Sequence, residues 1–104
     1  MYQVIVNPTS SSGKGMEAWN KIKEILDRRH VTYEVHVLRE PGEATDIARK
    51  LTAYCGDIDT VKLLVIGGDG TLNEVLNGIQ DLEHTTLSCI QTGSGNDFAR
   101  NMHL

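Results

Sequence analysis

The chain has 104 residues, a length that allows one domain able to bury roughly two thirds of its unfolded surface. Ten basic against fourteen acidic residues leave a net charge of −4, and there are one Phe, one Trp and three Tyr. This composition argues against a polybasic nucleic-acid or membrane patch and against an aromatic base-stacking surface. The sequence opens directly in a strand pattern, without an export signal, and no apolar run is long enough for a bilayer, so we expect a cytoplasmic protein.

Cysteines and histidines do not indicate a metal site. Cys55 and Cys89 lie far apart without a metal-ligand spacing, and we expect both to be reduced and buried. The four histidines are scattered along the chain and form no cluster.

The first third of the chain reads as strand, loop, helix and strand. Tyr2–Val6 is an apolar strand, Thr9–Gly15 a polar flexible loop, and Met16–Arg29 an amphipathic helix. Val31–Leu38 alternates apolar and polar residues, which predicts a half-exposed strand at a sheet edge. The helix is expected to turn four side chains inward: Trp19, Ile22, Ile25 and Leu26.

A second helix is expected over about Glu43–Tyr54, after the break at Pro41-Gly42 and before a turn at Gly56–Thr60. The continuous apolar run Leu63–Ile66 predicts a strand buried on both faces. After Thr71 the spacing becomes helical, with one face expected to carry Leu72, Val75, Leu76 and Ile79.

The last part of the chain offers a short strand at Leu87–Ile90 and a second glycine loop at Gln91–Asp97. Phe98–Leu104 looks like the first turns of a helix that is cut off, so we expect a fragment or separately expressed domain of a longer protein. Strands and helices thus alternate along the whole chain. This order predicts an α/β fold with three layers, α/β/α, around a mainly parallel sheet.

The stretch after Leu63–Ile66 carries the strongest signal. Gly67, Gly68 and Gly70 surround one acid, Asp69, between a buried strand and a helix, where ligands bind in parallel sheets. The stretch is neither a dinucleotide fingerprint, which needs a third glycine where Asn73 stands, nor a P-loop. Asp69 would repel bare phosphate, so a cation or a transferable proton is expected at the loop.

Three such loops, Asn7–Gly15, Gly67–Asn73 and Gly93–Asp97, follow strands that are expected to be parallel, so they should meet at one edge of the sheet. Hydroxyl and N–H donors suit phosphate oxygens, and carboxylates suit Mg²⁺, a combination that phosphoryl transfer requires. The loops supply hydroxyl groups from Thr9, Ser10, Ser11, Thr71 and Ser94, and side-chain amides from Asn7, Asn73 and Asn96. They also supply one cation, Lys14, and three acids, Asp69, Glu74 and Asp97.

Each loop also has a simpler explanation. Asn96-Asp97 can cap the last helix, Thr9–Ser12 can be a solvated turn, and the glycines around Asp69 can merely join a strand to a helix. Their joint placement favours a site.

These residues resemble the diacylglycerol kinase catalytic domain family, which includes bacterial lipid kinases, diacylglycerol kinases, sphingosine kinases and ceramide kinases. The resemblance covers the whole chain in the right order. Three motifs carry it: Asn7-Pro8-Thr9-Ser10; Gly67-Gly68-Asp69-Gly70-Thr71-Leu72-Asn73-Glu74-Val75; and Gly93-Ser94-Gly95-Asn96-Asp97-Phe98-Ala99-Arg100. NAD kinases share the central glycine-aspartate motif, but the first and third motifs favour lipid kinases.

The resemblance implies a transferase of phospholipid metabolism that uses ATP and Mg²⁺ to phosphorylate the hydroxyl of a diacylglycerol-like lipid. Residues 1–104 would be its N-terminal ATP-binding domain, without the β-rich domain that follows in the family. Asp69 would be the catalytic aspartate, either as the base that activates the substrate hydroxyl or through a link to Mg²⁺. The implied nucleotide contacts are Asn7, Thr9, Ser10, Ser11, Gly67, Gly68, Gly70, Thr71, Asn73, Glu74, Ser94 and Asn96.

The sequence departs from the family pattern in four places. Ser11 and Ser12 delay the first motif's glycine to Gly13, Gln91 stands where proline is usual, and Leu38 lies where some members have a nucleotide-contacting threonine. Ser94 replaces the usual threonine of the third motif.

The missing β-rich domain leads us to expect little phosphate transfer by these residues alone. In the full-length protein we expect peripheral contact with the inner membrane face, and a homo-oligomer is compatible with an exposed sheet edge. An NAD kinase-like enzyme and a stand-alone nucleotide-binding module remain the alternatives.

Overall fold

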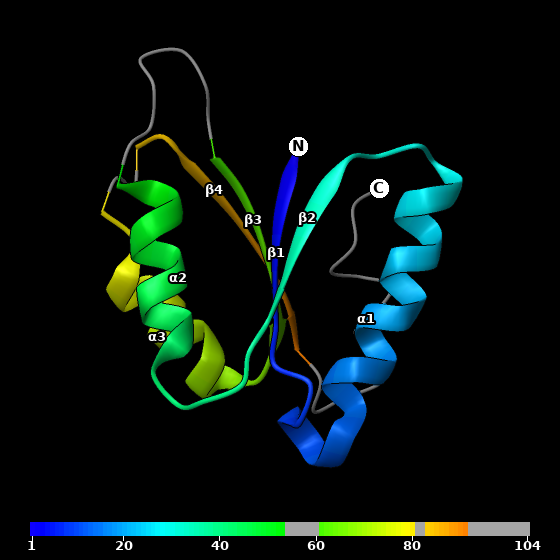
Figure 1. Cartoon of the computed structure of the whole chain (residues 1–104), viewed down its shortest axis with the longest axis horizontal. Coiled ribbons are helices and arrows are strands. Elements are labelled where there is room, and N and C mark those ends of the chain that lie inside the picture. The colour runs from blue at the N-terminus through cyan, green and yellow to red at the C-terminus, as the bar shows by residue number, and fades with distance from the viewer. Residues whose placement is uncertain (54–60, 81–82, 92–104) are drawn as a thin grey trace.

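A computed structural model describes residues 1–53, 61–80 and 83–91 of the chain. Within these residues, strands and helices alternate, and the strands form one parallel sheet in the order β2-β1-β3-β4 (Figure 1). The elements are β1 (Tyr2–Val6), α1 (Ser10–Arg28), β2 (Tyr33–Val37), α2 (Glu43–Thr52), β3 (Val61–Gly67), α3 (Asp69–Gly78) and β4 (Thr85–Gln91).

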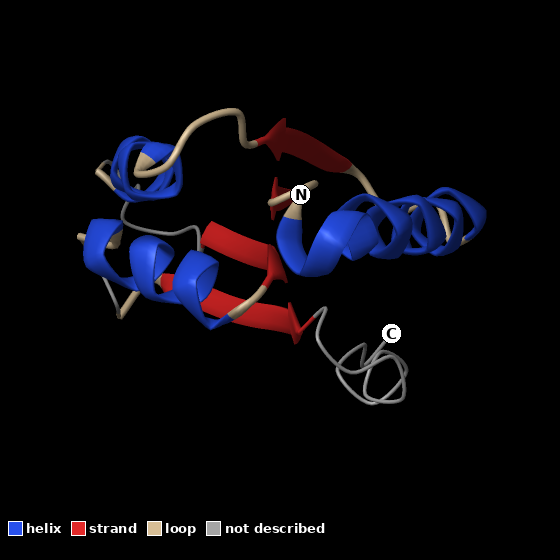
Figure 2. Ribbon diagram, turned by 90° about the horizontal axis from the view of Figure 1, so that it is seen from below, coloured by secondary structure: helices blue, strands red, loops and turns tan. Residues whose placement is uncertain are grey.

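The helices cover both faces of the sheet. Helix α1 lies on one side, and α2 and α3 lie together on the other, as Figure 1 and Figure 2 show from two directions. All three strand pairs are parallel. The predicted three-layer α/β/α fold with a parallel sheet is therefore confirmed.

The α1 face of the sheet is filled by large side chains. Trp19, Ile22 and Leu26 are buried against Val4, Val6, Leu64, Ile66 and Ile90 of the strands. The ring of Trp19 meets that of Tyr33 edge to face, with centroids 5.4 Å apart. Of the four inner residues expected from the helical spacing, Ile25 is only partly buried.

The opposite face is packed by smaller residues. Ala44 and Ala48 of α2 and Val75 of α3 are fully buried against Ile5, Leu63 and Val65. Gly78 lets the two helices approach closely, because a Cβ atom there would collide with the carbonyl oxygen of Thr45.

The burial of the strands follows the sequence pattern. Residues 63–66 of β3 are all buried, as the continuous apolar run predicts, and β2 is an edge strand with Glu34, Val35 and Val37 exposed. The buried central strand and the half-exposed edge strand are confirmed. The expected alternation of burial along β2 is not, because the neighbours Glu34 and Val35 are both exposed.

Two helix starts were placed wrongly. Helix α1 begins at Ser10, so most of the predicted Thr9–Gly15 loop is helical, and α3 begins at Asp69 instead of after Thr71. Serine and glycine have low helix propensity, but packing against the strand ends overrides that preference. Gly13 has φ of +96° within α1, so the helix is locally irregular where the first motif departs from the family pattern.

The buried face of α3 also differs from the expected one. Thr71, Val75 and Gly78 are buried, whereas Leu76 is 45% exposed. Of the four residues expected on this face, Val75 is fully buried, Leu72 and Ile79 are partly buried, and Leu76 is not, because close packing against α2 leaves room for small residues such as Gly78.

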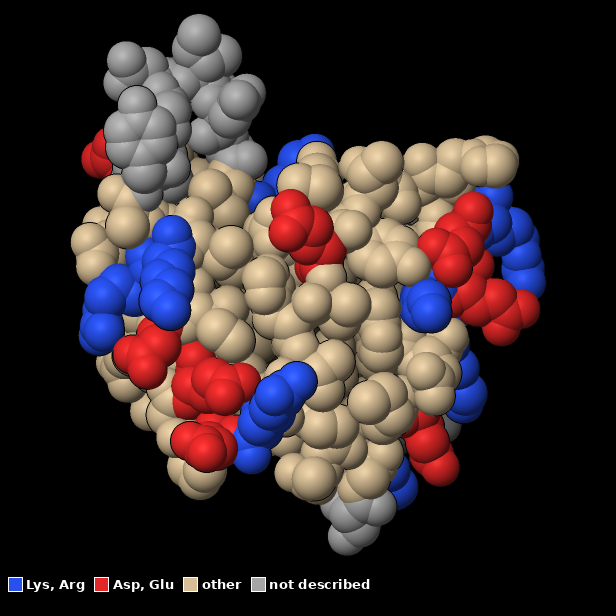
Figure 3. Space-filling model, in the orientation of Figure 1, with Lys and Arg blue, Asp and Glu red and all other residues tan. Residues whose placement is uncertain are grey.

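Some predictions fall outside the described residues: the turn at Gly56–Thr60, Cys55, the third motif beyond Gln91, and the helix at Phe98–Leu104. In the described part of the chain, no helix is both long and apolar enough to cross a membrane. In the face seen in Figure 3, charged side chains of both signs gather over the helices, and the area over the strands is largely uncharged.

Candidate functional site

The candidate site lies where the strand order reverses. From β1 the chain moves outward to β2, then returns across the sheet to β3 on the other side of β1. In open parallel sheets, ligands bind at the carboxyl ends of the two strands that flank such a reversal. Those ends are joined here, because the N–H of Asn7 donates to the carbonyl oxygen of Ile66 at 2.9 Å.

Asn7 organises the turn between β1 and α1. Its Oδ1 accepts hydrogen bonds from the N–H and the hydroxyl of Thr9, at 3.3 and 3.2 Å. Its Nδ2 donates to Oγ1 of Thr71 in α3, at 2.9 Å. Gly15 of α1 lies so close that a Cβ atom there would collide with the Asn7 carbonyl oxygen. One side chain therefore ties the first motif to the second.

At the junction between β3 and α3, the glycine backbone also lies close to neighbouring side chains. A Cβ atom at Gly67 would lie 2.8 Å from Oγ1 of Thr71, and one at Gly68 would lie 3.6 Å from Oγ of Ser10. Gly68 is the N-cap of α3, and its carbonyl oxygen accepts from the N–H of Leu72. The first N–H groups of a helix have no intrahelical acceptor, so this end of α3 can bind an anion.

Asp69 opens α3 and is exposed. Its Oδ1 accepts a hydrogen bond of 3.0 Å from Nε2 of Gln91, which ends β4 and lies opposite Gly67 in the strand register. Cys89 is half-buried in the same strand, and burial, followed by the negative charge of Asp69, raises the pKa of its thiol. The charge of Asp69 is therefore felt at the end of β4.

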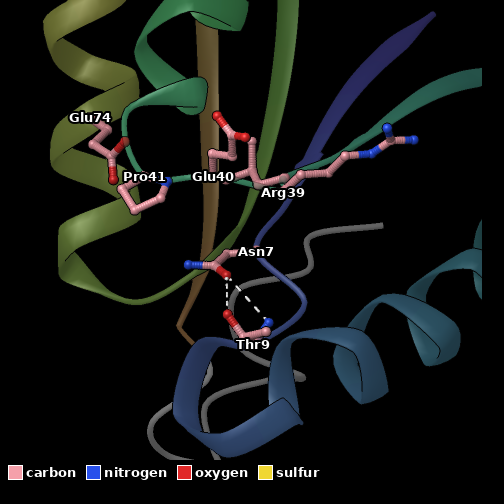
Figure 4. Close-up of a pocket in the computed structure, with 7 residues that line it drawn as sticks. Asn7, Thr9, Arg39, Glu40, Pro41 and Glu74 are labelled. Carbon is pink, nitrogen blue, oxygen red and sulfur yellow. Dashed lines mark hydrogen bonds between the residues drawn. The ribbon is translucent and has the colours of Figure 1, made fainter.

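A cavity of about 230 Å³ opens beside Asn7, between the β1–α1 turn, α3 and the segment that follows β2 (Figure 4). In Figure 4, Glu74 of α3 faces Pro41, while the side chain of Arg39 extends away from Glu74. The lining residues are Asn7, Thr9, Leu38, Arg39, Glu40, Pro41 and Glu74.

Three of these lining residues, at positions 39–41, are not among the site residues predicted from the sequence, and Leu38 enters there only as a departure from the family pattern. A signal for them exists, since they follow a parallel strand just as the glycine loops do, and the carboxyl-end rule applies to every strand of the sheet. They carry no glycine or hydroxyl cluster, which is the signal that marks the other loops.

The structure brings together most of the predicted site residues, which are Asn7, Thr9, Ser10, Gly67, Gly68, Asp69, Gly70, Thr71 and Glu74. Asn73 is exposed on α3. Ser94 and Asn96, as well as the side chain of Ser11, lie outside the described residues. Among the residues that are described, no group of three or more His, Cys, Asp or Glu could hold a metal ion.

Comparison with known families identifies the chain. The sequence model of the diacylglycerol kinase catalytic domain matches residues 1–104. The chain belongs to this family. The resemblance to this family that the three motifs carry is thus confirmed.

Relatives of this kinase-family chain occur in bacteria and in eukaryotes, including "Ceramide kinase" of Oryza sativa subsp. japonica, which is 33% identical over 94% of the chain. The chain is 35% identical to "Putative lipid kinase YtlR" and 36% identical to "Diacylglycerol kinase", both of Bacillus subtilis, over 96% and 94% of its length. A solved structure, "A putative diacylglycerol kinase from Bacillus anthracis str. Sterne", superposes on 95% of the chain with a TM-score of 0.67 and 31% identity. The chain spans 32%, 31% and 34% of these three Bacillus proteins, about one third of each.

Proposed function

We propose that residues 1–104 form the ATP-binding domain of a lipid kinase that transfers the γ-phosphoryl group of ATP to the hydroxyl of a diacylglycerol-like lipid. The observation that carries this proposal is the hydrogen bond from Asn7 to Thr71, which joins the first and second family motifs at the reversal of the sheet. A glycine-lined helix start beside a cavity suits a nucleotide and its phosphates.

The proposed roles follow from the geometry. Gly68, Gly70 and the start of α3 would face the phosphates, since neither glycine carries a side chain that would block their approach, while Gly67 makes room for the side chain of Thr71. The cavity beside Thr9 would take part of the nucleotide. The remaining nucleotide contacts proposed from the motifs are Ser10, Ser11, Gly67, Asn73, Ser94 and Asn96.

Asp69 would act at the reacting end. In the transfer, the lipid oxygen forms a bond to the γ-phosphorus, the bond from that phosphorus to the β–γ bridging oxygen breaks, and ADP leaves. The hydroxyl proton must go to a base, and Asp69 is the exposed carboxylate at the glycine junction.

Mg²⁺ fits this donor set, because proteins usually hold it through one or two carboxylates together with substrate phosphates. Asp69 would supply the carboxylate, directly or through water, and the ion would neutralise charge on the phosphates.

A second, β-rich domain in the full-length protein would supply the lipid-binding surface and further carboxylates. Because the chain spans about one third of its relatives, we expect the fragment alone to transfer little phosphate. We further propose that the full-length protein is cytoplasmic and touches the inner membrane face to reach its lipid.

The test is a pair of measurements on the full-length protein. Calorimetric titration with ATP should show binding that depends on Mg²⁺, and radiolabelled ATP should label diacylglycerol but not NAD⁺. Asp69→Asn should lower kcat at least about a hundredfold, the usual effect of losing a general base. Labelling of NAD⁺ instead of lipid, or full activity of Asp69→Asn, would contradict the proposal.

A further inference from the structure

Glu74 belongs to the central motif, yet its carboxylate makes a contact of a different kind from a phosphate or metal ligand. Its Oε1 accepts a hydrogen bond of 2.7 Å from the backbone N–H of Gly42, the N-cap residue of α2. We infer that Glu74 is a positioning residue that fastens the β2–α2 loop (residues 38–42), one wall of the cavity, to α3. The inference rests on the proposed function, because the cavity is taken to hold part of the nucleotide.

The loop itself is a small closed unit. The N–H of Arg39 donates to Oε1 of Glu43 at 3.2 Å, and the N–H of Glu43 donates back to the carbonyl oxygen of Glu40 at 3.3 Å. Gly42 has φ of +86°, a conformation that other L residues rarely adopt. A loop closed in this way moves as one piece, so a single attachment can fix its position.

A second hydrogen bond between α2 and Glu74 supports this attachment. The hydroxyl of Thr45 donates to the backbone carbonyl oxygen of Glu74 at 2.8 Å, so the same residue is held twice by the start of α2. Farther along the pair, Gly78 lies in close contact with Thr45 and Ala48. Because the helices are already fixed against each other, the Glu74 carboxylate meets the Gly42 N–H with little further ordering. A negative charge at the start of α2 is also favourable.

The bond also accounts for the direction of the Glu74 side chain. Figure 4 shows it at the cavity edge, beside Pro41. Asp69, by contrast, is held by Gln91 at the end of β4. The two acids of the central motif therefore serve different elements, with Asp69 toward the reacting end and Glu74 toward the cavity wall.

This role has a chemical signature. A glutamine at position 74 keeps an oxygen that can accept from the Gly42 N–H, but it has no charge to bind Mg²⁺ or take a proton. A methionine of similar length has no such acceptor. If Glu74 positions the loop, glutamine preserves function and methionine does not. If the Glu74 carboxylate instead binds a metal ion or accepts a proton, both variants lose function to the same extent.

The experiment compares Glu74→Gln and Glu74→Met in the full-length protein. Asp46→Asn is the matched control, since it removes an acid from the first turn of α2, the helix whose N-cap Glu74 contacts, and Asp46 pairs there with Arg49. We expect Glu74→Met to raise KM for ATP about tenfold with kcat within about twofold, while Glu74→Gln stays within about threefold of the wild type in both and Asp46→Asn is unchanged. If Glu74→Met does not fold, Glu74→Ala takes its place.

Hydrogen exchange of the peptide that contains Gly42 gives a readout that needs no activity. Exchange at this amide should be about tenfold faster in Glu74→Met than in the wild type, and unchanged in Glu74→Gln. Equal loss of kcat in both variants, or unchanged exchange in Glu74→Met, would overturn the inference. If the wild-type protein binds no ATP, the proposed function fails, and exchange at Gly42 alone then decides whether Glu74 holds the loop.

Discussion

The two faces of the sheet are built in different ways. On the α1 face, one long helix covers the strands with large side chains such as Trp19 and Leu26. On the other face, the two short helices α2 and α3 contact each other closely at Ala48 and Gly78. Hydrogen bonds between side chains and the backbone join α3 to the start of α2. The first face buries apolar area, and the second fixes backbone segments relative to one another.

This difference bears on one wall of the candidate site, the one formed by Glu74 and the segment that follows β2, whereas Asn7 and Thr9 of the other wall belong to the β1–α1 turn. A face filled by large apolar side chains gains its stability mainly from the apolar area that it buries. A site that must hold phosphates needs backbone groups at fixed distances, which close helix contact and directed hydrogen bonds provide. The cavity residue Glu74 accordingly belongs to the α2–α3 pair.

The strongest test of the contrast removes volume from the α1 face. Leu26→Ala empties a fully buried position, and we expect it to lower the free energy of unfolding by about 3 kcal/mol. Urea unfolding of the chain, followed by the fluorescence of Trp19, measures this. Ile25→Ala, on the same helix but only partly buried, should cost about 1 kcal/mol. Equal effects of the two would contradict the packing described for α1.

The second test adds volume to the other face. Gly78→Ala places a methyl group against the carbonyl oxygen of Thr45, so the helices must separate, at an expected cost of about 2 kcal/mol. Gly70→Ala in the same helix meets nothing within 4 Å, and it should leave stability unchanged or raise it by about 0.5 kcal/mol. A neutral Gly78→Ala in the same unfolding assay would mean that α2 and α3 are not in close contact.

The third test concerns the bond that joins the two motifs. Thr71 is buried, and Thr71→Val removes the acceptor of the Asn7 amide while keeping the side-chain shape. We expect a loss of about 1 kcal/mol in unfolding free energy, the usual net value of one hydrogen bond. Thr71→Ser keeps the hydroxyl as a control for the bond. If valine is no worse than serine, Asn7 does not depend on Thr71.

The smallest expected effect is on the acidity of Cys89. Burial is the larger cause of its raised pKa and the charge of Asp69 the smaller. Asp69→Asn removes the smaller cause, so the pKa of the thiol should fall and the thiolate fraction at pH 8 should rise. Alkylation of Cys89 by iodoacetamide, followed by mass spectrometry of its peptide, should become a few times faster. Slower alkylation would contradict the placement of Asp69 near this thiol.

The sequence was sufficient for the order of the elements and for the character of two strands. The apolar run at Leu63–Ile66 and the mixed apolar and polar sequence at Val31–Leu38 correctly predict a central and an edge strand, because only the central strand is buried on both faces. The central motif around Asp69 predicts the family, which the match over residues 1–104 confirms, whereas the roles of its residues stay a prediction.

The contacts that the sequence did not predict depend on which strands are neighbours in the sheet. The segment 38–41 lines the cavity because β2 pairs with β1, and Gln91 reaches Asp69 because β4 pairs with β3. A hydrophobic period fixes neither pairing. The start of α1 at Ser10 was missed for a similar reason, since its support comes from the Asn7 carbonyl oxygen and the packing of Gly15 instead of from local propensity.

The position of β1 in the sheet also sets an order of events during synthesis. This first strand pairs with β2 on one side and with β3 on the other, and β3 ends only at Gly67. A nascent chain that has not yet emerged past Gly67 can form the β1–α1–β2 unit but lacks the strand that pairs with the second edge of β1. Until then that strand edge stays unpaired, and the ribosome-bound chain exposes the segment most able to associate with a neighbouring chain.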